Sequence, residues 1–586
     1  MSSQVHLLPP LIALLLFLSA TQAKAIWGST AVSLTPSLTP SLSMNLMTSS
    51  TASPAANSTT LPVVDLGYEC HQAISLNETG GYFNFSNIRY SEAPVGNLRF
   101  REPVEPATRD TCFVTNGSTG RVCPQTSGNW STINSQFVPK YLQGLLFDYD
   151  SAMSSLPDSP PDISTDPRTT EDCLFLDVIA PQSAFTQRTS GLPVLIWVHG
   201  GGYSSGEKTG YGNFNPAGLL AASGSDPSFI FVVINYRLGA FGWLGSDEVE
   251  GDGTMNAGLY DQRLAFQWVQ KYIHLFGGNK DYVTVMGSSA GAGSIMHHVT
   301  SFGSTGDVAF NQAIMFSTAF MPYPSSDIPT ASFNDFMNML NVSSLEAVRK
   351  LPSKTLIAAN ALHIYSHDPY GRTLYGPTVD GAISPALPGQ LLAEGSFHQN
   401  LTIMVAHNTL EGLIFTKPTI NSTDDYLSML RESMPSISDE AISTINKTLY
   451  PAVFDGTYGY KDQFQRALVT VQDSIIACNS RYMASAMADR AYAIRFAVPP
   501  GLHGEETPYI FQNGATADVN TDVANRLQQY IMSFVTNSVP VTANGTAIPT
   551  YGASSRVMKM QASGSTLITD DTSKVRCAWW QQALYA

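Results

Sequence analysis

The chain has 586 residues, of which 31 are basic and 46 are acidic, and its formal net charge at pH 7 is −15. So acidic a protein argues against nucleic acid or an anionic membrane surface as a partner, because neither counterion release nor headgroup attraction is available to it. Its length alone would suggest several domains.

The first 25 residues are typical of a secretory signal peptide. They contain no acid, an apolar run from Leu11 to Leu18, and small residues at Ala23 and Ala25 that suit signal peptidase. The competing interpretation is a membrane anchor, but the run is far shorter than the roughly 20 residues that span a bilayer. We therefore expect a secreted, extracellular protein without an integral membrane segment.

Residues 26–60 are rich in Ser, Thr and Pro and have few of the apolar clusters that a packed core needs. We interpret them as a disordered extension without chemistry. From about residue 61 the composition is globular as far as residue 586. Because the motifs described below are scattered from 171 to 511 and make sense only in one fold, we predict a single large domain with long insertions over 61–586.

Six cysteines in a chain that looks secreted indicate disulfides, although six cysteines allow fifteen pairings. Pairing of sequence neighbours predicts Cys70–Cys112 and Cys123–Cys173, which leaves Cys478–Cys577. No C-x-x-C pair occurs, so a zinc site on sulfur is not expected. Asn-x-Ser/Thr sequons, which mark surface loops where they are glycosylated, occur at Asn57, Asn77, Asn84, Asn116, Asn129, Asn341, Asn400, Asn421, Asn446 and Asn544.

Between Glu171 and Gln270, apolar strands alternate with glycine-marked turns. Strands are predicted at 174–179, 194–198 and 229–234, and the apolar residues from Leu264 to Tyr272 recur at helical spacing. Strands that alternate with helices favour a mostly parallel sheet with helices on both faces, so the predicted fold class is α/β.

Three consecutive glycines, Gly200 to Gly202, directly follow the strand predicted at 194–198. Such a run destabilises regular structure, but it brings bare backbone N–H groups close to a ligand. The alternative is a flexible surface loop. A nucleophile motif farther along the chain would favour an oxyanion hole instead.

That motif lies between Lys280 and Thr300. An apolar strand over 282–286 enters Gly-Ser-Ser-Ala-Gly at 287–291, which has the G-x-S-x-G pattern of a serine held on a sharp strand-to-helix turn. Flanking residues must be small there, and the helix N-terminus points free N–H groups at a developing anion. We predict Ser289 as the nucleophile.

A second G-x-S-x-G, at 202–206, makes Ser204 the rival nucleophile. Ser204 lies in a glycine-rich loop with no helical pattern after it, so the context favours Ser289.

The chain resembles the type-B carboxylesterase/lipase family, which includes fungal secreted lipases and the cholinesterases. Five segments carry the resemblance in the family's order and with similar spacing: EDCL at 171–174, HGGGY at 199–203, NYRLGAFGWLG at 235–245, NAGLYDQRLAFQWVQKYI with FGG at 256–278, and GSSAGAGS at 287–294. The resemblance spans roughly residues 61–586. It implies the α/β-hydrolase fold and a serine carboxylic ester hydrolase that needs no cofactor and acts on small-molecule or lipid esters.

The family's Ser–Glu–His triad can be placed on this sequence. HNTLEGLIF at 407–415 is similar to the family's acid loop and implies Glu411 as the orienting carboxylate, whereas GLHGEETPYIF at 501–511 resembles its histidine loop and implies His503 as the base. Glu505 and Glu506 are the rival acids, but neighbours within one loop rarely have the required geometry. The order Ser289, Glu411, His503 agrees with this fold.

By the same resemblance, the backbone N–H groups of Gly201, Gly202 and Ala290 would form the oxyanion hole, and two buried ion pairs would join Arg99 to Glu171 and Arg237 to Asp261. One departure from the family is Ser288, where members usually carry Glu. We therefore expect that a negative charge near the nucleophile is missing, which argues against cholinesterase-like cation chemistry.

Three further features are open from sequence. His363 and His367 have a spacing that could bring two metal ligands onto one helical face, but H-E-x-x-H is absent, so we expect packing or pocket lining and no metal. His297 and His298 are expected to pack on the sheet. Apolar residues from Leu142 to Leu156 follow the pattern of one amphipathic helix, and this helix is either a lid, as in the fungal lipases, or packed permanently on the domain.

The alternative function is a non-catalytic, cholinesterase-like adhesion or binding protein on the same fold. Such members usually lose the serine or the histidine. This chain keeps Ser289, Glu411, His503 and the glycine loop, so we predict a secreted enzyme that hydrolyses carboxylic esters through an acyl-enzyme.

Overall fold

In the computed structural model of the chain, the described residues are 61–160, 166–187, 190–210, 214–223, 229–323, 325 and 327–585. The signal peptide expected at 1–25, the extension expected at 26–60 and the sequon at Asn57 lie outside them. Among the described residues, no helix has the length and apolar character needed to span a membrane.

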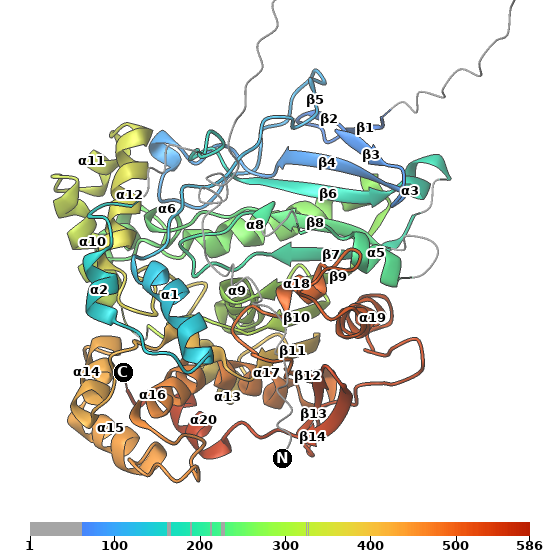
Figure 1. The fold of residues 1–586 in the computed structure, drawn as a ribbon. Helices are drawn as coiled ribbons and strands as arrows, with labels where there is room; N and C mark the ends of the chain where they lie inside the picture. Colours follow the sequence, from blue (N-terminus) through green and yellow to red (C-terminus); the bar gives the residue numbers. More distant parts are fainter. Residues whose placement is uncertain are drawn as a thin grey trace, which may run out of the picture.

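An eleven-stranded sheet runs through the whole described chain, in the order β14-β13-β12-β11-β10-β9-β7-β8-β6-β4-β3 (Figure 1). Neighbouring strands from β8 through β13 are parallel, and the strands at both edges are antiparallel. The strands are β3 (Ser75–Asn77), β4 (Tyr82–Arg89), β6 (Phe175–Pro181), β7 (Leu192–Val198), β8 (Ile230–Ile234), β9 (Gly278–Ser288), β10 (Gln312–Phe316), β11 (Thr402–Asn408), β12 (Ala491–Phe496), β13 (Arg556–Gln561) and β14 (Gly564–Thr569). The mostly parallel α/β architecture predicted from sequence is confirmed.

The central strands are apolar on both faces because helices cover both. In β7, Ile196 and Val198 face one core, with α8 (Ala257–Tyr272), α9 (Ala290–Val299) and α17 (Cys478–Met487). Leu195 and Trp197 face the other core, with α5 (Ala217–Ala222), α18 (Thr507–Ile510) and α19 (Thr521–Asn537). Alternate residues of a strand point to opposite faces, so a strand covered twice carries no polar face.

Most other helices gather at one end of the sheet, on the left in Figure 1, where α1 and α2 lie between two helical groups. These insertions cover the carboxyl ends of β9, β11 and β12, which is where ligands bind in open α/β sheets. The helices are α1 (Trp130–Leu142), α2 (Tyr149–Ser154), α10 (Asp327–Met339), α11 (Leu345–Arg349), α12 (Ser353–His367), α14 (Thr423–Ser433), α15 (Asp439–Thr444) and α16 (Gln463–Gln472).

Covalent and ionic links tie the long loops to this frame. The disulfides are Cys70–Cys112, Cys123–Cys173 and Cys478–Cys577, the same pairs that sequence nearness predicted. The ion pairs expected from the family resemblance are also present, since Arg99 contacts Glu171 and Arg237 contacts Asp261 through two hydrogen bonds each.

The single helix predicted over 142–156 is wrong. Helix α1 ends at Leu142, Gly144 adopts a left-handed backbone with φ of 68°, and α2 begins only at Tyr149. Gly144 reaches positive φ without a steric penalty and so ends the first helix. The apolar residues that looked like one buried helical face are partly exposed, and Leu146 is 97% exposed.

Candidate active site

Ser289 stands on the turn between β9 and α9. Its φ of 58° and ψ of −127° are rare for a residue with a side chain. The backbone is held there on both sides, because Ser289 N donates to Phe316 O at 2.9 Å and Ala319 N donates to Ser289 O at 3.2 Å. This geometry projects the hydroxyl out of the carboxyl end of the sheet.

The glycines around Ser289 are required by close packing. A Cβ on Gly291 would lie 2.2 Å from Val198 O, and one on Gly287 would lie 2.8 Å from the carbonyl carbon of Gly291. These distances are far below any real carbon contact. The G-x-S-x-G pattern therefore brings β7, β9 and α9 together at the serine.

His503 lies between the serine and a carboxylate. Its Nε2 is 2.8 Å from Ser289 Oγ, and its Nδ1 is 2.6 Å from Glu411 Oε2. Glu411 begins a short 3-10 helix, Glu411–Phe415, directly after β11, and His503 follows β12. The three residues are far apart in sequence, but they follow β9, β11 and β12, which lie within four consecutive strands of the sheet.

Glu411 is completely buried, yet it is held as an anion. Burial by itself raises the pKa of this carboxyl, but the adjacent His503 and the backbone N–H of Asn408, which donates to Oε1 at 2.6 Å, outweigh burial and lower the pKa. A charged Glu411 stabilises the Nδ1–H tautomer of His503, which leaves Nε2 free to accept the serine proton.

The glycine loop faces Ser289. Gly201 and Gly202 have φ of 114° and 61°, which suit glycine, and a Cβ on Gly200 would lie 2.9 Å from Ser289 Cβ. Within the described chain, the backbone N–H groups of Gly201, Gly202 and Ala290 donate no hydrogen bond. Three unused donors beside a serine hydroxyl are suited to an oxyanion.

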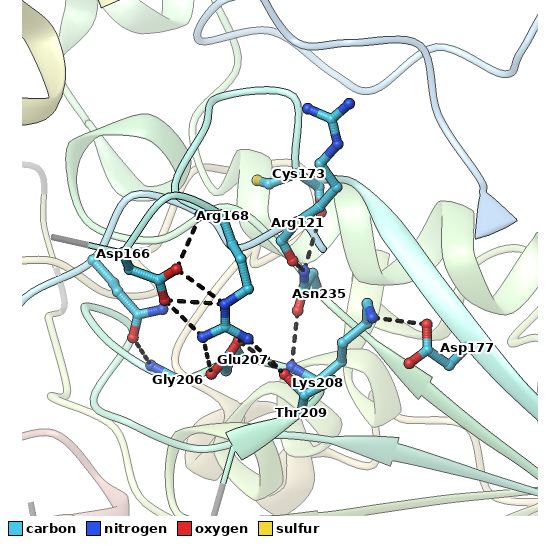
Figure 2. Close-up of polar contacts among 11 residues, drawn as sticks. Arg121, Asp166, Arg168, Cys173, Asp177, Gly206, Glu207, Lys208, Thr209 and Asn235 are labelled. Atoms are coloured by element: carbon cyan, nitrogen blue, oxygen red, sulfur yellow. Dashed lines mark hydrogen bonds and ion pairs between the residues drawn. The ribbon is translucent and has the colours of Figure 1, made fainter. Parts of the chain in front are cut away.

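A buried polar network holds the far end of the glycine loop, as Figure 2 shows. Lys208 Nζ lies 2.7 Å from Asp177 Oδ1, and both side chains are buried. The Lys208 backbone N–H donates to Asn235 Oδ1 at 2.8 Å, and Asn235 Nδ2 donates to the carbonyl of Arg121. Arg168, which pairs with Glu207, adds a second link. The loop is thus joined to β6, β8 and the Cys123–Cys173 segment.

The sequence analysis expected no negative charge near the nucleophile, and the structure places a buried carboxyl group, that of Glu506, beside Ser288. Ser288 Oγ donates to Glu506 Oε1 at 2.7 Å, and Asn408 Nδ2 donates to Glu506 Oε2 at the same distance. Glu506 is completely buried; burial raises its pKa, and the negative charge of Glu411 raises it further. Sequence reasoning treated Glu506 only as a rival acid and missed its contact with Ser288, because the two are joined only by the fold.

Glu505, the other rival acid, binds its own loop. Its Oε2 accepts the backbone N–H groups of Gly501 and Leu502 at 2.7 and 2.9 Å, and burial raises its pKa to about 7. Neither Glu505 nor Glu506 contacts the imidazole of His503 by a hydrogen bond, whereas Glu411 does.

The other serine and three of the other histidines considered from sequence are buried in packed parts of the structure. Ser204 is buried, and its hydroxyl has no hydrogen-bond partner in the described chain, so no histidine activates it. His363 Nδ1 contacts the hydroxyl of Tyr375 at 2.8 Å inside the core. His297 and His298 are buried on α9, where burial lowers the pKa of each to about 3.

Two cavities meet in front of Ser289. The first, about 60 Å³, is lined by the nucleophile and the glycine loop, and the second, about 360 Å³, extends under α14. Both are bordered by Met321, Gly371, Phe415 and Ile475. Helix α1 supplies Trp130 to the first cavity, and its Phe137 and Val138 pack against Leu413 and Ile414 beside Glu411.

Comparisons with known proteins find relatives over most of the chain. The family model described as "Carboxylesterase family" matches residues 72–580. The chain is 38% identical over 545 residues to carboxylesterase patB of Aspergillus clavatus, which covers 89% of this chain and 96% of that protein. It is 29% identical to a secreted lipase of Arthroderma benhamiae over 71% of this chain and 83% of the lipase. The crystal structure of Aspergillus niger EstA, 25% identical, superposes with a TM-score of 0.73 and covers 89% of this chain and 98% of its own.

Proposed function

Because the chain belongs to the carboxylesterase family, we propose that its hydrolysis of carboxylic esters proceeds through an acyl-enzyme on Ser289, with His503 as the base and Glu411 as its orienting carboxylate. One observation carries the assignment: the imidazole of His503 contacts Ser289 Oγ at 2.8 Å and Glu411 Oε2 at 2.6 Å. This is the arrangement that serine hydrolysis requires.

In the first half of the reaction, His503 Nε2 takes the hydroxyl proton as Ser289 Oγ attacks the ester carbonyl. The carbonyl oxygen becomes an anion, which the N–H groups of Gly201, Gly202 and Ala290 stabilise by about 3 kcal/mol for each donor. The imidazolium, stabilised by charged Glu411, then gives its proton to the leaving alcohol. The carbonyl re-forms as the acyl ester of Ser289.

In the second half, water takes the place of the alcohol. His503 removes a proton from the water as its oxygen attacks the acyl carbon, and the same N–H groups bind the second oxyanion. Protonation of Ser289 Oγ releases the carboxylic acid and restores the enzyme.

The family relationship supports an enzyme over a non-catalytic binding protein. We also propose that the enzyme is secreted as one large domain over 61–586. The secreted lipase among its relatives and the three disulfides support this location, since disulfides persist in oxidising compartments.

The experiment is hydrolysis of a p-nitrophenyl acyl ester by wild type, Ser289→Ala and Ser204→Ala. We expect Ser289→Ala to lose activity by about 10⁴-fold or more, because no nucleophile remains, and Ser204→Ala to keep most of it. A fluorophosphonate probe should label Ser289, as peptide mass spectrometry would show. Label on Ser204, or an active Ser289→Ala enzyme, would overturn the assignment.

A further inference from the structure

Asp368 lies on the wall of the Ser289 cavity, where the triad does not use it. It follows the last residue of α12, and its exposed fraction is only 8%. Oδ1 accepts the backbone N–H of Leu374 at 2.8 Å, whereas Oδ2 accepts no hydrogen bond and the carboxyl forms no ion pair among the described residues. One half of a buried carboxyl group is therefore left to the cavity.

The indole of Trp130 and the side chain of Asp368 both lie close to Gly128. A Cβ on Gly128 would lie 2.6 Å from both Asp368 Cβ and Trp130 Nε1, so only glycine at 128 allows the two side chains to meet there. Trp130 Nε1 is buried and donates to no group of the described chain, although an indole N–H usually finds an acceptor.

A third unpartnered group lies at the same place. The ring of Tyr370 is 5.7 Å from the ring of Trp130, and its buried hydroxyl has no partner among the described residues. Tyr370 lines the larger cavity, so the three groups mark the junction of the two cavities. The first cavity is also lined by apolar residues, namely Ala319, Phe320, Met321, Phe415 and Ile475.

We infer that Asp368 and Trp130 form a polar subsite that binds a hydroxyl group of the ester substrate, so that the preferred substrates are hydroxylated esters. The inference rests on the proposed function, since it concerns the cavity in front of Ser289. Buried polar groups without partners are unfavourable, and a ligand that supplies the missing hydrogen bonds removes this penalty.

The donors and acceptors of the subsite select the ligand group. Burial raises the pKa of Asp368 to about 8, so the carboxyl is largely neutral at pH 7. A hydroxyl oxygen can accept both the Trp130 N–H and the O–H that the neutral carboxyl carries at Asp368 Oδ2. An ammonium group cannot accept from Trp130, and a methyl group satisfies neither partner.

The test compares three butanoate esters of equal length whose alcohol chains end in a methyl, a hydroxyl or an ammonium group, together with a matching set that varies the end of the acyl chain. For wild type we expect kcat/KM for the hydroxyl ester to exceed that for the methyl ester by about tenfold to a hundredfold in one of the two sets. For the ammonium ester, kcat/KM should not exceed the value for the methyl ester. Equal values for hydroxyl and methyl esters in both sets, or a preference for ammonium, would overturn the subsite.

Substitutions test whether Asp368 and Trp130 cause the preference for hydroxyl esters over methyl esters. In Asp368→Leu the hydroxyl-to-methyl ratio should fall to about one, in Trp130→Phe it should fall severalfold, and in Asp368→Asn most of it should remain, because an amide still donates and accepts. The ratio is taken within each variant, so loss of folded protein cancels. The control is Asp281→Leu in the exposed first half of β9, which should keep the wild-type ratio.

Different results would contradict the proposed function and the subsite. A wild-type protein that hydrolyses none of the esters would contradict the proposed function. If Ser289-dependent hydrolysis has equal kcat/KM for hydroxyl and methyl esters, only the subsite is contradicted.

Discussion

Ser288 donates a hydrogen bond of 2.7 Å to Glu506, a residue 218 positions away in the chain. The contact joins the residue before the nucleophile to the loop that carries His503. Asn408 connects this pair to the triad, since its backbone N–H donates to Glu411 and its side-chain amide to Glu506. Two buried carboxyl groups thus share one asparagine, one as the partner of histidine and the other as the partner of serine.

Two replacements of Glu506 test how much its hydrogen bonds contribute to stability. Glu506→Ala leaves Ser288 Oγ without a partner in the core and removes one of the two hydrogen bonds that Asn408 Nδ2 donates, so we expect a loss of about 3 kcal/mol in the free energy of unfolding. Glu506→Gln retains a group that can bond to both and should lose less than half as much. Urea denaturation at neutral pH measures both values. Equal losses in the two variants would show that the hydrogen bonds are not what stabilises this region.

Asp368 should make stability depend on pH. Its raised pKa means that the folded protein holds a proton that the unfolded chain releases, so the free energy of unfolding falls as pH rises from about 4 to about 8. Asp368→Asn removes this proton, and its stability relative to wild type should rise through that window by up to about 1.4 kcal/mol for each pH unit. Denaturation curves at several pH values measure the difference. Parallel pH dependence in wild type, Asp368→Asn and the exposed control Asp281→Asn would contradict the prediction.

Gly201→Ala should damage catalysis more than folding. The added Cβ would lie 2.1 Å from Ser205 O, and φ of 114° disfavours any side chain, so the loop must shift and move its N–H groups. We expect kcat to fall by about 10²-fold to 10³-fold. Gly306→Ala is the matched control, because Gly306 also has positive φ but a Cβ there meets open space. A similar loss of kcat in both variants would point to general backbone strain.

The ion pair in Figure 2 should support the glycine loop. Lys208→Met leaves the Asp177 carboxylate buried without its cation, which should cost about 3 to 5 kcal/mol of stability. Lys208→Met with Asp177→Asn should recover a substantial part, because Asn still accepts the backbone N–H of Asn87 that Asp177 Oδ1 accepts now. Thermal unfolding of the single and double variants tests this. If the double variant is less stable than Lys208→Met, the unpaired Asp177 carboxylate is not the cause of the stability loss in Lys208→Met.

Local sequence patterns determined where several strands of this protein begin and end. The strand bounds predicted around residues 174–179, 194–198 and 229–234 agree with β6, β7 and β8 to within two residues, because apolar runs between glycine-marked turns are legible without tertiary information. Ser289 was predictable for the same reason, since close packing around its turn requires glycine at 287 and 291.

Other features depended on the fold. A hydrophobic period predicted one helix where Gly144 separates two, because the period does not reveal a backbone that turns to positive φ. The Ser288–Glu506 contact and the meeting of Asp368 with Trp130 carry no sequence signal, since each joins loops whose approach is decided by strand order in the sheet. A sequence specifies which side chains can do chemistry, but only long-range packing decides which of them share a cavity and which buried group remains without a partner.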